Sequence, residues 1–142
     1  MAPTIFLTGA SGCTGGTFLT VFHQRFPEIR VRALVRTPEQ IEILRAFYGP
    51  TVEPLLGSLD NKKLLAAEAS KATIVFQAGA NHEDAIVALV EGIATSPENK
   101  SLSPVFIHLS GTSSLTDPAL PYGELNPKVY SDVDDMEEVL LR

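Results

Sequence analysis

Short runs of apolar and β-branched residues recur along the chain, separated by longer segments of mixed polarity. Runs of this length and composition are typical of buried strands. Five of them predict strands, at residues 4–8, 31–35, 52–56, 73–77 and 105–109. The third run contains Pro54, and because proline cannot donate a hydrogen bond to a neighbouring strand, we expect this strand at an edge of the sheet.

The intervening segments have the spacing of amphipathic helices. Thr37, Pro38 and Gln40 predict a helix start, with Thr37 as the N-cap, proline in the first helical position and Gln40 completing a capping box. Asp60 is expected to cap a helix over residues 61–70, and Asn81 a helix over residues 82–95. The residues predicted to face the core are Phe18, Val21, Phe22 and Phe26 in the first helix, Ile41, Leu44, Phe47 and Tyr48 in the second, and Ile86, Leu89, Val90 and Ile93 in the last.

Strands and helices therefore alternate five times. This alternation predicts an α/β fold with a doubly wound parallel sheet of about five strands between two layers of helices, the three-layer Rossmann arrangement. The pattern stops after Ser110. Residues 111–130 are rich in turn-forming residues, and residues 131–141 are compatible with one short acidic helix.

The composition bounds the class of protein. The chain has 142 residues, of which 44% are hydrophobic and 20% charged, which fits one globular domain. Its formal net charge of −6 argues against nucleic acid as the main partner. No apolar run approaches the ~20 residues that span a membrane, and the N-terminus lacks the basic region of a signal peptide. The single cysteine excludes an internal disulfide and favours the cytoplasm.

The strongest motif is a glycine-rich loop at residues 8–16, between the first strand and the first helix. Gly9 would allow a sharp turn, Gly12 would let the backbone approach a diphosphate, and Gly15 would allow close packing of helix on strand. The following helix would offer free N–H groups and a positive dipole end to the anion. An alternative is a tight turn with no ligand. The other loop residues predicted to bind a cofactor are Ser11, Cys13 and Thr14.

This loop and the strand that follows it resemble those of the extended and atypical short-chain dehydrogenases/reductases, in particular the NmrA-like and NAD-dependent epimerase/dehydratase group. The resemblance covers residues 4–114. It implies a dinucleotide-binding domain at residues 1–114, followed by an irregular tail at residues 115–142 that would begin a further part of the protein. The abrupt end of the chain favours a fragment over a complete small module.

The end of the second strand bears on the choice of dinucleotide. NAD-binding folds usually place an acid there, on the ribose hydroxyls, whereas this chain has Arg36 and Thr37. A guanidinium and a hydroxyl suit a ribose 2′-phosphate, so we expect NADP(H) to be favoured over NAD(H). The alternative for Arg36 is a solvated surface residue.

The resemblance extends the predicted cofactor site to two further loops. Ser58 and Leu59 occupy the place where the family contacts adenine, although Ser58 replaces the usual acid. The residues Ala78, Gly79 and Ala80 match the small residues that approach the cofactor backbone. The three histidines have no metal-ligand spacing, so no metal site is predicted. Cys13 is either a reactive thiolate near a helix N-terminus or a small loop filler.

Relatives with enzymatic activity use a hydroxyl residue after the fifth strand and a Tyr-x-x-x-Lys pair. Thr112 and Ser113 match the hydroxyl position. The pair is absent, because the residues four places after Tyr48, Tyr122 and Tyr130 are not lysine.

Two functions stay open. One is the NAD(P)-binding domain of an oxidoreductase or epimerase that would be incomplete and inactive as this chain, with a small-molecule substrate. The other is a non-catalytic NAD(P)-sensing regulator of the NmrA-like type. The unpaired sheet edge beyond the fifth strand would also favour a homodimer.

Overall fold

The computed structural model describes residues 3–79, 81–95, 104–111, 119–131 and 133–140. The chain divides into two compact units, Met1–Leu109 and Ser110–Arg142. The first unit contains the sheet and the second contains one short helix, and each is described separately. In the described part of the chain, no helix is long and apolar enough to cross a membrane.

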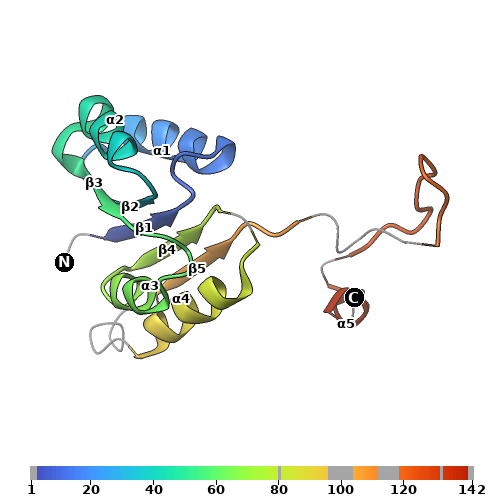
Figure 1. Ribbon diagram of the computed structural model, residues 1–142. Coiled ribbons are helices and arrows are strands. Elements are labelled where there is room, and N and C mark those ends of the chain that lie inside the picture. Colours follow the sequence, from blue (N-terminus) through green and yellow to red (C-terminus); the bar gives the residue numbers. More distant parts are fainter. Residues whose placement is uncertain (1–2, 80, 96–103, 112–118, 132, 141–142) are drawn as a thin grey trace. The chain divides into compact units, whose positions relative to one another are not determined.

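The first unit is built on a five-stranded sheet with the strand order β3-β2-β1-β4-β5 (Figure 1). All four pairings are parallel. The edge position of the proline-containing strand is confirmed. The strands are β1 Thr4–Thr8, β2 Arg30–Val35, β3 Val52–Leu56, β4 Ile74–Gln77 and β5 Val105–His108.

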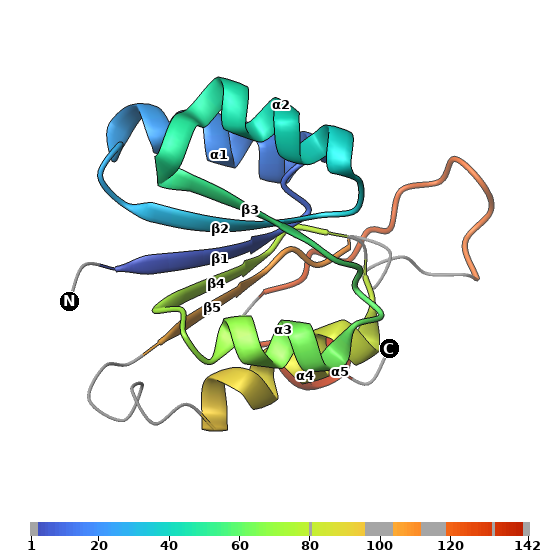
Figure 2. The same ribbon diagram turned by 60° about the vertical axis from the view of Figure 1, so that its left-hand side comes forward.

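Helices cover both faces of this sheet. The helices α1 and α2 lie on one face, and α3 and α4 lie on the other (Figures 1 and 2). The predicted three-layer, doubly wound α/β fold is therefore confirmed. The helices are α1 Cys13–Arg25, α2 Pro38–Tyr48, α3 Lys62–Ala69 and α4 Glu83–Thr95, with a short 3₁₀ turn η1 at Gly49–Thr51.

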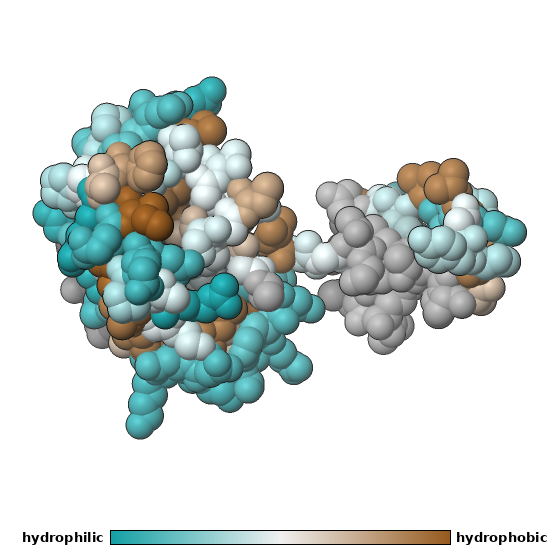
Figure 3. Space-filling model, turned by 45° about the horizontal axis from the view of Figure 1, so that its top comes forward, coloured by the Kyte–Doolittle hydropathy of each residue, from teal (hydrophilic) through white to brown (hydrophobic). Residues whose placement is uncertain are grey.

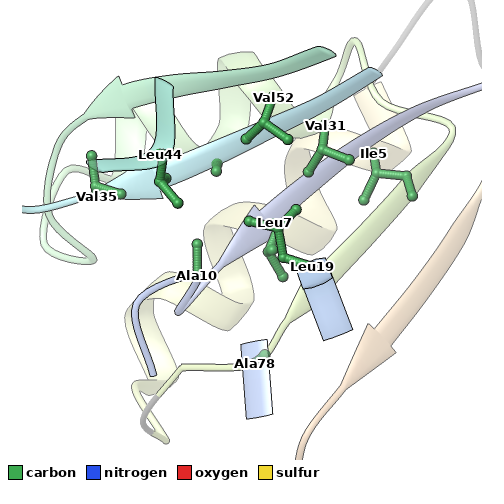
Figure 4. Close-up of a cluster of buried hydrophobic side chains, with 10 residues drawn as sticks. Ile5, Leu7, Ala10, Leu19, Val31, Val35, Leu44, Val52 and Ala78 are labelled. Carbon is green, nitrogen blue, oxygen red and sulfur yellow. The ribbon is translucent and has the colours of Figure 1, made fainter. Parts of the chain in front are cut away.

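Each face of the sheet buries its own hydrophobic cluster. On the face of α1 and α2, side chains from three strands converge on Leu19 of α1 and Leu44 of α2 (Figure 4). The opposite cluster joins Phe6 and Val75 of the sheet to Leu65 and Leu89 of the helices. The alternation of side chains along each strand divides neighbouring residues between the two clusters.

The helix starts show one expected cap and two corrections. The capping box of α2 is confirmed, since Thr37 Oγ1 accepts the N–H of Gln40 at 3.4 Å. The cap of α3 is Asn61, not Asp60, because Asp60 instead bonds Ser58 and His82. Similarly, α4 begins at Glu83, and its first turn is capped by His82 rather than by Asn81. The Nδ1 of His82 accepts the N–H of Ala85 at 3.3 Å.

Several residues predicted to face the core are exposed. In α4, a Cβ at Gly92 would lie 2.4 Å from the Ala66 carbonyl oxygen, so α3 and α4 pack closely through small residues. Val90 does not take part in this contact and is 45% exposed. Phe47 is 77% exposed, because Leu44 makes the buried contact of α2. Ile43 of the same helix is also exposed. Figure 3 shows brown, hydrophobic side chains among teal ones on the face that is turned forward. Val21 of α1 and Phe26, which directly follows α1, are also exposed.

The second unit contains α5, Met136–Leu140, which is shorter than the acidic helix expected over residues 131–141. Before α5, side chains rather than a further helical turn accept the backbone N–H groups. The N–H of Ser131 donates to Asp135 Oδ2 at 2.8 Å, and Ser131 Oγ accepts the N–H of Val133 at 3.2 Å. Such local bonds compete with helix formation. Lys128 pairs with Asp135 and Glu138 and lies over the ring of Tyr130.

Candidate nucleotide-binding site

The strand order locates a crevice at one end of the sheet. From β1 the chain passes to β2 on one side, whereas β4 pairs with β1 on the other side. In open parallel sheets, ligands bind outside the carboxyl ends of the strands where the order reverses in this way. The loop after β1 and the loop after β4 meet at this point, since Gly9 lies against the backbone of Ala78.

Two of the loop glycines are required by packing. Gly9 has a φ of +76°, and a Cβ on it would lie 2.7 Å from the carbonyl carbon of Ala78. The N–H of Gly12 donates to the Gly9 carbonyl oxygen at 2.9 Å, which closes a tight turn. A Cβ on Gly15 would lie 2.2 Å from that same oxygen. The turn and the first turn of α1 therefore leave no room for a side chain at either Gly9 or Gly15.

Gly12 and Gly79 differ from this pair. A Cβ on Gly12 would meet one atom, the Gly9 carbonyl oxygen, at 3.3 Å. Among the described residues, a Cβ on Gly79 would meet no atom closer than 3.6 Å. A methyl group would thus be in ordinary contact at Gly79 and would require a small shift of the Gly9 carbonyl oxygen at Gly12, and both residues line a pocket at the end of β1. Glycine at these positions keeps the pocket wide, and backbone rather than side chain faces its interior.

The N-terminus of α1 points its free donors toward this turn. The helix begins at Cys13, its N-cap is Gly12, and no side chain caps it. The first intrahelical bond to the N-cap comes from the N–H of Gly16, at 2.8 Å. The N–H groups of the preceding first turn have no acceptor within the helix, so together with the helix dipole they can hold an anion.

The pocket has a volume of about 300 Å³. Seven of the predicted cofactor residues line it, together with Leu34 and Val35 at the end of β2, which were not predicted. Their place in the sequence could have indicated this role, because residues at the carboxyl end of a strand beside the glycine loop border the crevice. The seven are Gly9, Ser11, Gly12, Arg36, Leu59, Ala78 and Gly79.

Other predicted site residues lie outside the lining of this pocket. Gly15 is buried in the helix–turn contact, and Cys13 is exposed at the helix start. Thr37 caps α2, and Ser58 Oγ donates to Asp60 Oδ2 at 2.7 Å, so both hydroxyls have local partners. Thr14 is also outside the lining. Ala80, Thr112 and Ser113 lie outside the described residues.

Arg36 is the charged residue of the pocket. It directly follows β2, and its N–H donates to Gln40 Oε1 at 2.9 Å, which ties it to the first turn of α2. Among the residues the structure describes, no carboxylate pairs with its guanidinium. The exposed side chain is therefore available to an anionic ligand.

The wall opposite the glycine loop is braced by a small polar cluster. Leu59 lies between Ser58 and Asp60 in the β3–α3 loop. Asp60 Oδ1 is 3.1 Å from His82 Nε2, just before α4. Hydrogen bonds from Ser58 and His82 hold the pKa of the Asp60 carboxyl below its ordinary value. This carboxyl is thus ionised at neutral pH and accepts from both partners.

Three polar residues stand in register at the carboxyl ends of three neighbouring strands. Thr8, Gln77 and His108 are paired across β1, β4 and β5. His108 Nδ1 lies 2.8 Å from Gln77 Oε1. Thr8 Oγ1 is fully buried and, among the described residues, has no hydrogen-bond partner. A Cβ on Gly79 would lie 3.7 Å from it, so this hydroxyl lies next to the pocket wall.

A larger hollow of about 750 Å³ lies between α1 and α2 and shares Ser11 and Val35 with the pocket. Among the described residues that line this hollow, none is Asp, Glu, Lys or Arg, and neither Gly12 nor Arg36 is among them. It therefore offers a phosphate no side chain with a permanent positive charge. Among the described residues, no group of three or more His, Cys, Asp or Glu side chains could hold a metal ion.

Comparisons with known proteins agree with this fold. No family model matches the chain. A short-chain dehydrogenase/reductase from Saccharomyces cerevisiae matches with a TM-score of 0.68 and 19% identity, over 82% of this chain and 56% of that chain. The yeast methylglyoxal/isovaleraldehyde reductase Gre2, solved with NADPH, matches with a TM-score of 0.57 and 19% identity, over 80% of this chain and 40% of that chain. The fold is the Rossmann fold of the short-chain dehydrogenases/reductases.

A sequence relative extends beyond this domain. The chain is 34% identical to the oxidase ucsJ of an Acremonium species over 144 aligned positions. The match covers 99% of this chain and 40% of ucsJ. The chain thus spans less than half the length of this curated relative.

Proposed function

We propose that this chain binds a nicotinamide dinucleotide through the pocket at the end of β1, as the cofactor domain of an oxidoreductase related to the short-chain dehydrogenases/reductases. The observation that carries the proposal is the contrast among the loop glycines. Packing leaves no room for a Cβ at Gly9 or Gly15, whereas it leaves more room at Gly12 and Gly79, which line the pocket. The likeness to ucsJ and to a reductase solved with NADPH supports the same function.

The residues present fit such a ligand. The diphosphate would accept the free N–H groups of the first turn of α1, with Gly12 next to it. The ribose would lie at the end of β2, where Arg36 stands without a carboxylate partner among the described residues. The base would face Leu59 across the pocket from Gly79. The bound nicotinamide supplies hydride chemistry.

The loop assignment is tested by a matched pair of variants. A Cβ on Gly12 or Gly16 meets a carbonyl oxygen at 3.3 or 3.2 Å, but only Gly12 lines the pocket. Isothermal titration with NADPH should show weaker binding for Gly12→Ala and none for Gly12→Val, whose side chain fills the place of the diphosphate. Gly16→Ala should bind as wild type does. Wild-type affinity in Gly12→Val would remove the loop from the site.

We further propose a preference for NADP(H) over NAD(H), supported by the unpaired guanidinium of Arg36 and the absence of an acid at the end of β2. Arg36→Ala should lower NADPH affinity by about tenfold, as for a lost charge-assisted hydrogen bond, and leave NADH affinity unchanged. Arg30→Ala, at the other end of the same strand, is the control. Equal NADPH and NADH affinities in the wild type would refute the preference.

A second candidate function is a non-catalytic NAD(P)-sensing regulator, favoured by the lack of a Tyr-x-x-x-Lys pair. In both cases this chain should bind the dinucleotide and oxidise no NADPH with a panel of carbonyl compounds. A protein that continues the chain and contains the pair would favour the enzyme. Robust turnover by this chain would contradict the expectation that it is inactive without a Tyr-x-x-x-Lys pair.

The homodimer expectation rests on the two edges of the sheet. The β3 edge contains Pro54 and the ion-paired Glu53, which protect it from pairing. The β5 edge exposes Val105 and Ile107 and carries no charge from Asp, Glu, Lys or Arg. We propose that two copies pair through β5. Light scattering over a concentration series should then detect a dimer that Ile107→Lys abolishes, and a wild-type monomer at all concentrations would refute it.

A further inference from the structure

Tyr48, the last residue of α2, bridges α1 and α2 beside the hollow of about 750 Å³ between these helices. Its hydroxyl lies 2.9 Å from Thr20 Oγ1, and its ring lies edge-on to the ring of His23, with 5.3 Å between the centroids. From this bridge the hollow extends to Gln40 in the first turn of α2 and to Ser11 of the glycine loop. It is therefore a space between two helices that are held at a fixed separation.

The two walls of the hollow differ in polarity. The wall from α2 includes Ile43 and Phe47, which are 54% and 77% exposed. The wall from α1 includes the polar residues Thr20, His23 and Gln24. Covering the exposed apolar side chains would remove apolar surface from water, which is favourable. A volume between about 300 and 1,000 Å³ with this mixture of side chains is typical of small-molecule sites.

The aromatic side chains of the hollow favour an aromatic occupant. Three rings line it, those of His23, Phe47 and Tyr48. The Thr20 hydroxyl donates to the Gly16 carbonyl oxygen at 2.9 Å, so the Tyr48 hydroxyl donates to Thr20 and both helices hold its ring in place. The centroids of the Phe47 and Tyr48 rings are 6.4 Å apart. A planar ring placed here would gain aromatic contacts in addition to its burial.

The polar groups favour a neutral molecule with a hydrogen-bond acceptor. In the described part of the chain, the lining has no carboxylate and no lysine or arginine to balance a charged ligand. Gln40 Oε1 accepts the N–H groups of Arg36 and Thr37, at 2.9 and 3.3 Å, which fixes the orientation of the amide. Among the residues that the structure describes, none accepts a hydrogen bond from Gln40 Nε2. This donor is available to a ligand.

We propose that the hollow is a second binding site, which takes a neutral aromatic molecule with a hydrogen-bond acceptor such as a carbonyl group. This site goes beyond the proposed dinucleotide function, because its ligand can enter without the dinucleotide. The hollow and the dinucleotide pocket share Ser11 and Val35, so the two ligands would be neighbours. Phe47 lines only the hollow and Gly12 lines only the pocket, so each site can be altered separately.

The probe for this site is prodan, a neutral naphthalene ketone whose fluorescence shifts to the blue in apolar surroundings. The nucleotide-free wild type should bind it saturably, with one prodan per chain. Phe47→Ser should lower the affinity about fivefold, as for a lost aromatic contact. Saturable binding with the same affinity in Phe47→Ser would overturn the proposal.

Phe26→Ser is the matched control. Phe26 is also an exposed phenylalanine, at 43%, but it does not line the hollow. This variant should bind prodan as the wild type does. An equal loss in Phe26→Ser would overturn the proposal, because the probe would then be reporting exposed apolar surface in general.

Amide chemical shifts test where the probe lies. Prodan should shift the amide resonances of Gly16, Thr20 and Phe47 and leave those of α3 and α4 unchanged. Shifts confined to α3 and α4 would overturn the proposal. If the wild type binds no prodan and Phe47→Ser alters its oligomeric state in light scattering, the hollow is covered by a second copy of the chain and the proposal fails.

Failure of this site and failure of the proposed function are distinguishable. Gly12→Val should still bind prodan, and Phe47→Ser should still bind NADPH. If the wild type binds prodan in the hollow but no dinucleotide, the proposed function fails while the second site stands. If it binds dinucleotide but no prodan, the second site fails while the proposed function stands.

Discussion

Two cavities of similar size lie at opposite ends of the strands of the first unit, and they differ in how their charged residues are paired. At their amino ends, a cavity of about 320 Å³ is bordered by Arg32, which bonds Glu68 at 2.9 Å and Glu53 at 3.0 Å. Lys71 adds a third bond to Glu68 at 3.1 Å. At their carboxyl ends, a cavity of about 300 Å³ is bordered by Arg36 and glycine backbone.

The difference lies in the balance of charge. The Glu68 side chain is 8% exposed, and a carboxylate so buried is tolerated only with partners, which Arg32 and Lys71 supply. In the amino-end cavity, Arg32 and Lys71 thus pair with carboxylates, and Arg30 also lines this cavity. The carboxyl-end cavity has a cation and a helix N-terminus, and in the described part of the chain no carboxylate offsets Arg36. Among the described residues, the two cavities therefore differ in that carboxylates line the amino-end cavity, whereas the carboxyl-end cavity is lined by a cation and glycine backbone with no carboxylate.

The largest expected effect concerns the glycine loop, in which one glycine is needed for packing and another lines the pocket. Gly15→Ala places a methyl group 2.2 Å from the Gly9 carbonyl oxygen, between backbone atoms that cannot yield cheaply. We expect the free energy of unfolding to fall by about 3 kcal/mol or more, measured by urea denaturation. Gly12→Ala is the control and should change it by less than about 1 kcal/mol. Equal stability of both variants would show that the loop does not separate these roles.

The next effect concerns the amino-end cavity. Glu68→Ala leaves Arg32 partly buried without its closer partner, so the free energy of unfolding should fall by about 2 kcal/mol, while NADPH affinity stays unchanged. Glu42→Ala removes an ion pair whose side chains are 62% and 76% exposed, and its effect should stay within about 0.5 kcal/mol. A loss of NADPH affinity in folded Glu68→Ala would break the distinction between the two cavities.

Sequence periodicity predicted most of this fold because the strands are short apolar runs with strong boundaries. All five strands lie where the runs are, within one residue at each end. The capping box of α2 is local and was readable. The exposure of Val90 was not, because it depends on how closely Gly92 lets α4 approach α3. The partners of Arg32 were likewise hidden, since Glu68 lies 36 residues away along the chain.

The candidate site was predicted less completely than the fold. The glycine loop, Arg36 and the two small residues after β4 come together at one pocket because they follow strands that are neighbours in the sheet. Leu34 and Val35 were missed because they belong to the core as well as to the wall. The roles predicted for Thr37 and Ser58 stay predictions, since local geometry gives each hydroxyl a partner nearby.

The smallest expected effect tests the charge network of the amino-end cavity by pH. Burial raises the pKa of Glu68, but hydrogen bonds from Arg32 and Lys71 outweigh it and hold the pKa below its ordinary value. The resulting stability is present above the pKa of an unfolded glutamate, about 4.3, and is lost as the pH falls through the lower pKa of the folded state. Urea midpoints measured from pH 7 down to acid should fall more steeply for the wild type than for Glu68→Gln. The other carboxylates titrate in both proteins, so the difference between the two sets of urea midpoints reports Glu68. If the midpoints of both proteins fell in parallel with pH, the partners of Glu68 would add no stability at neutral pH.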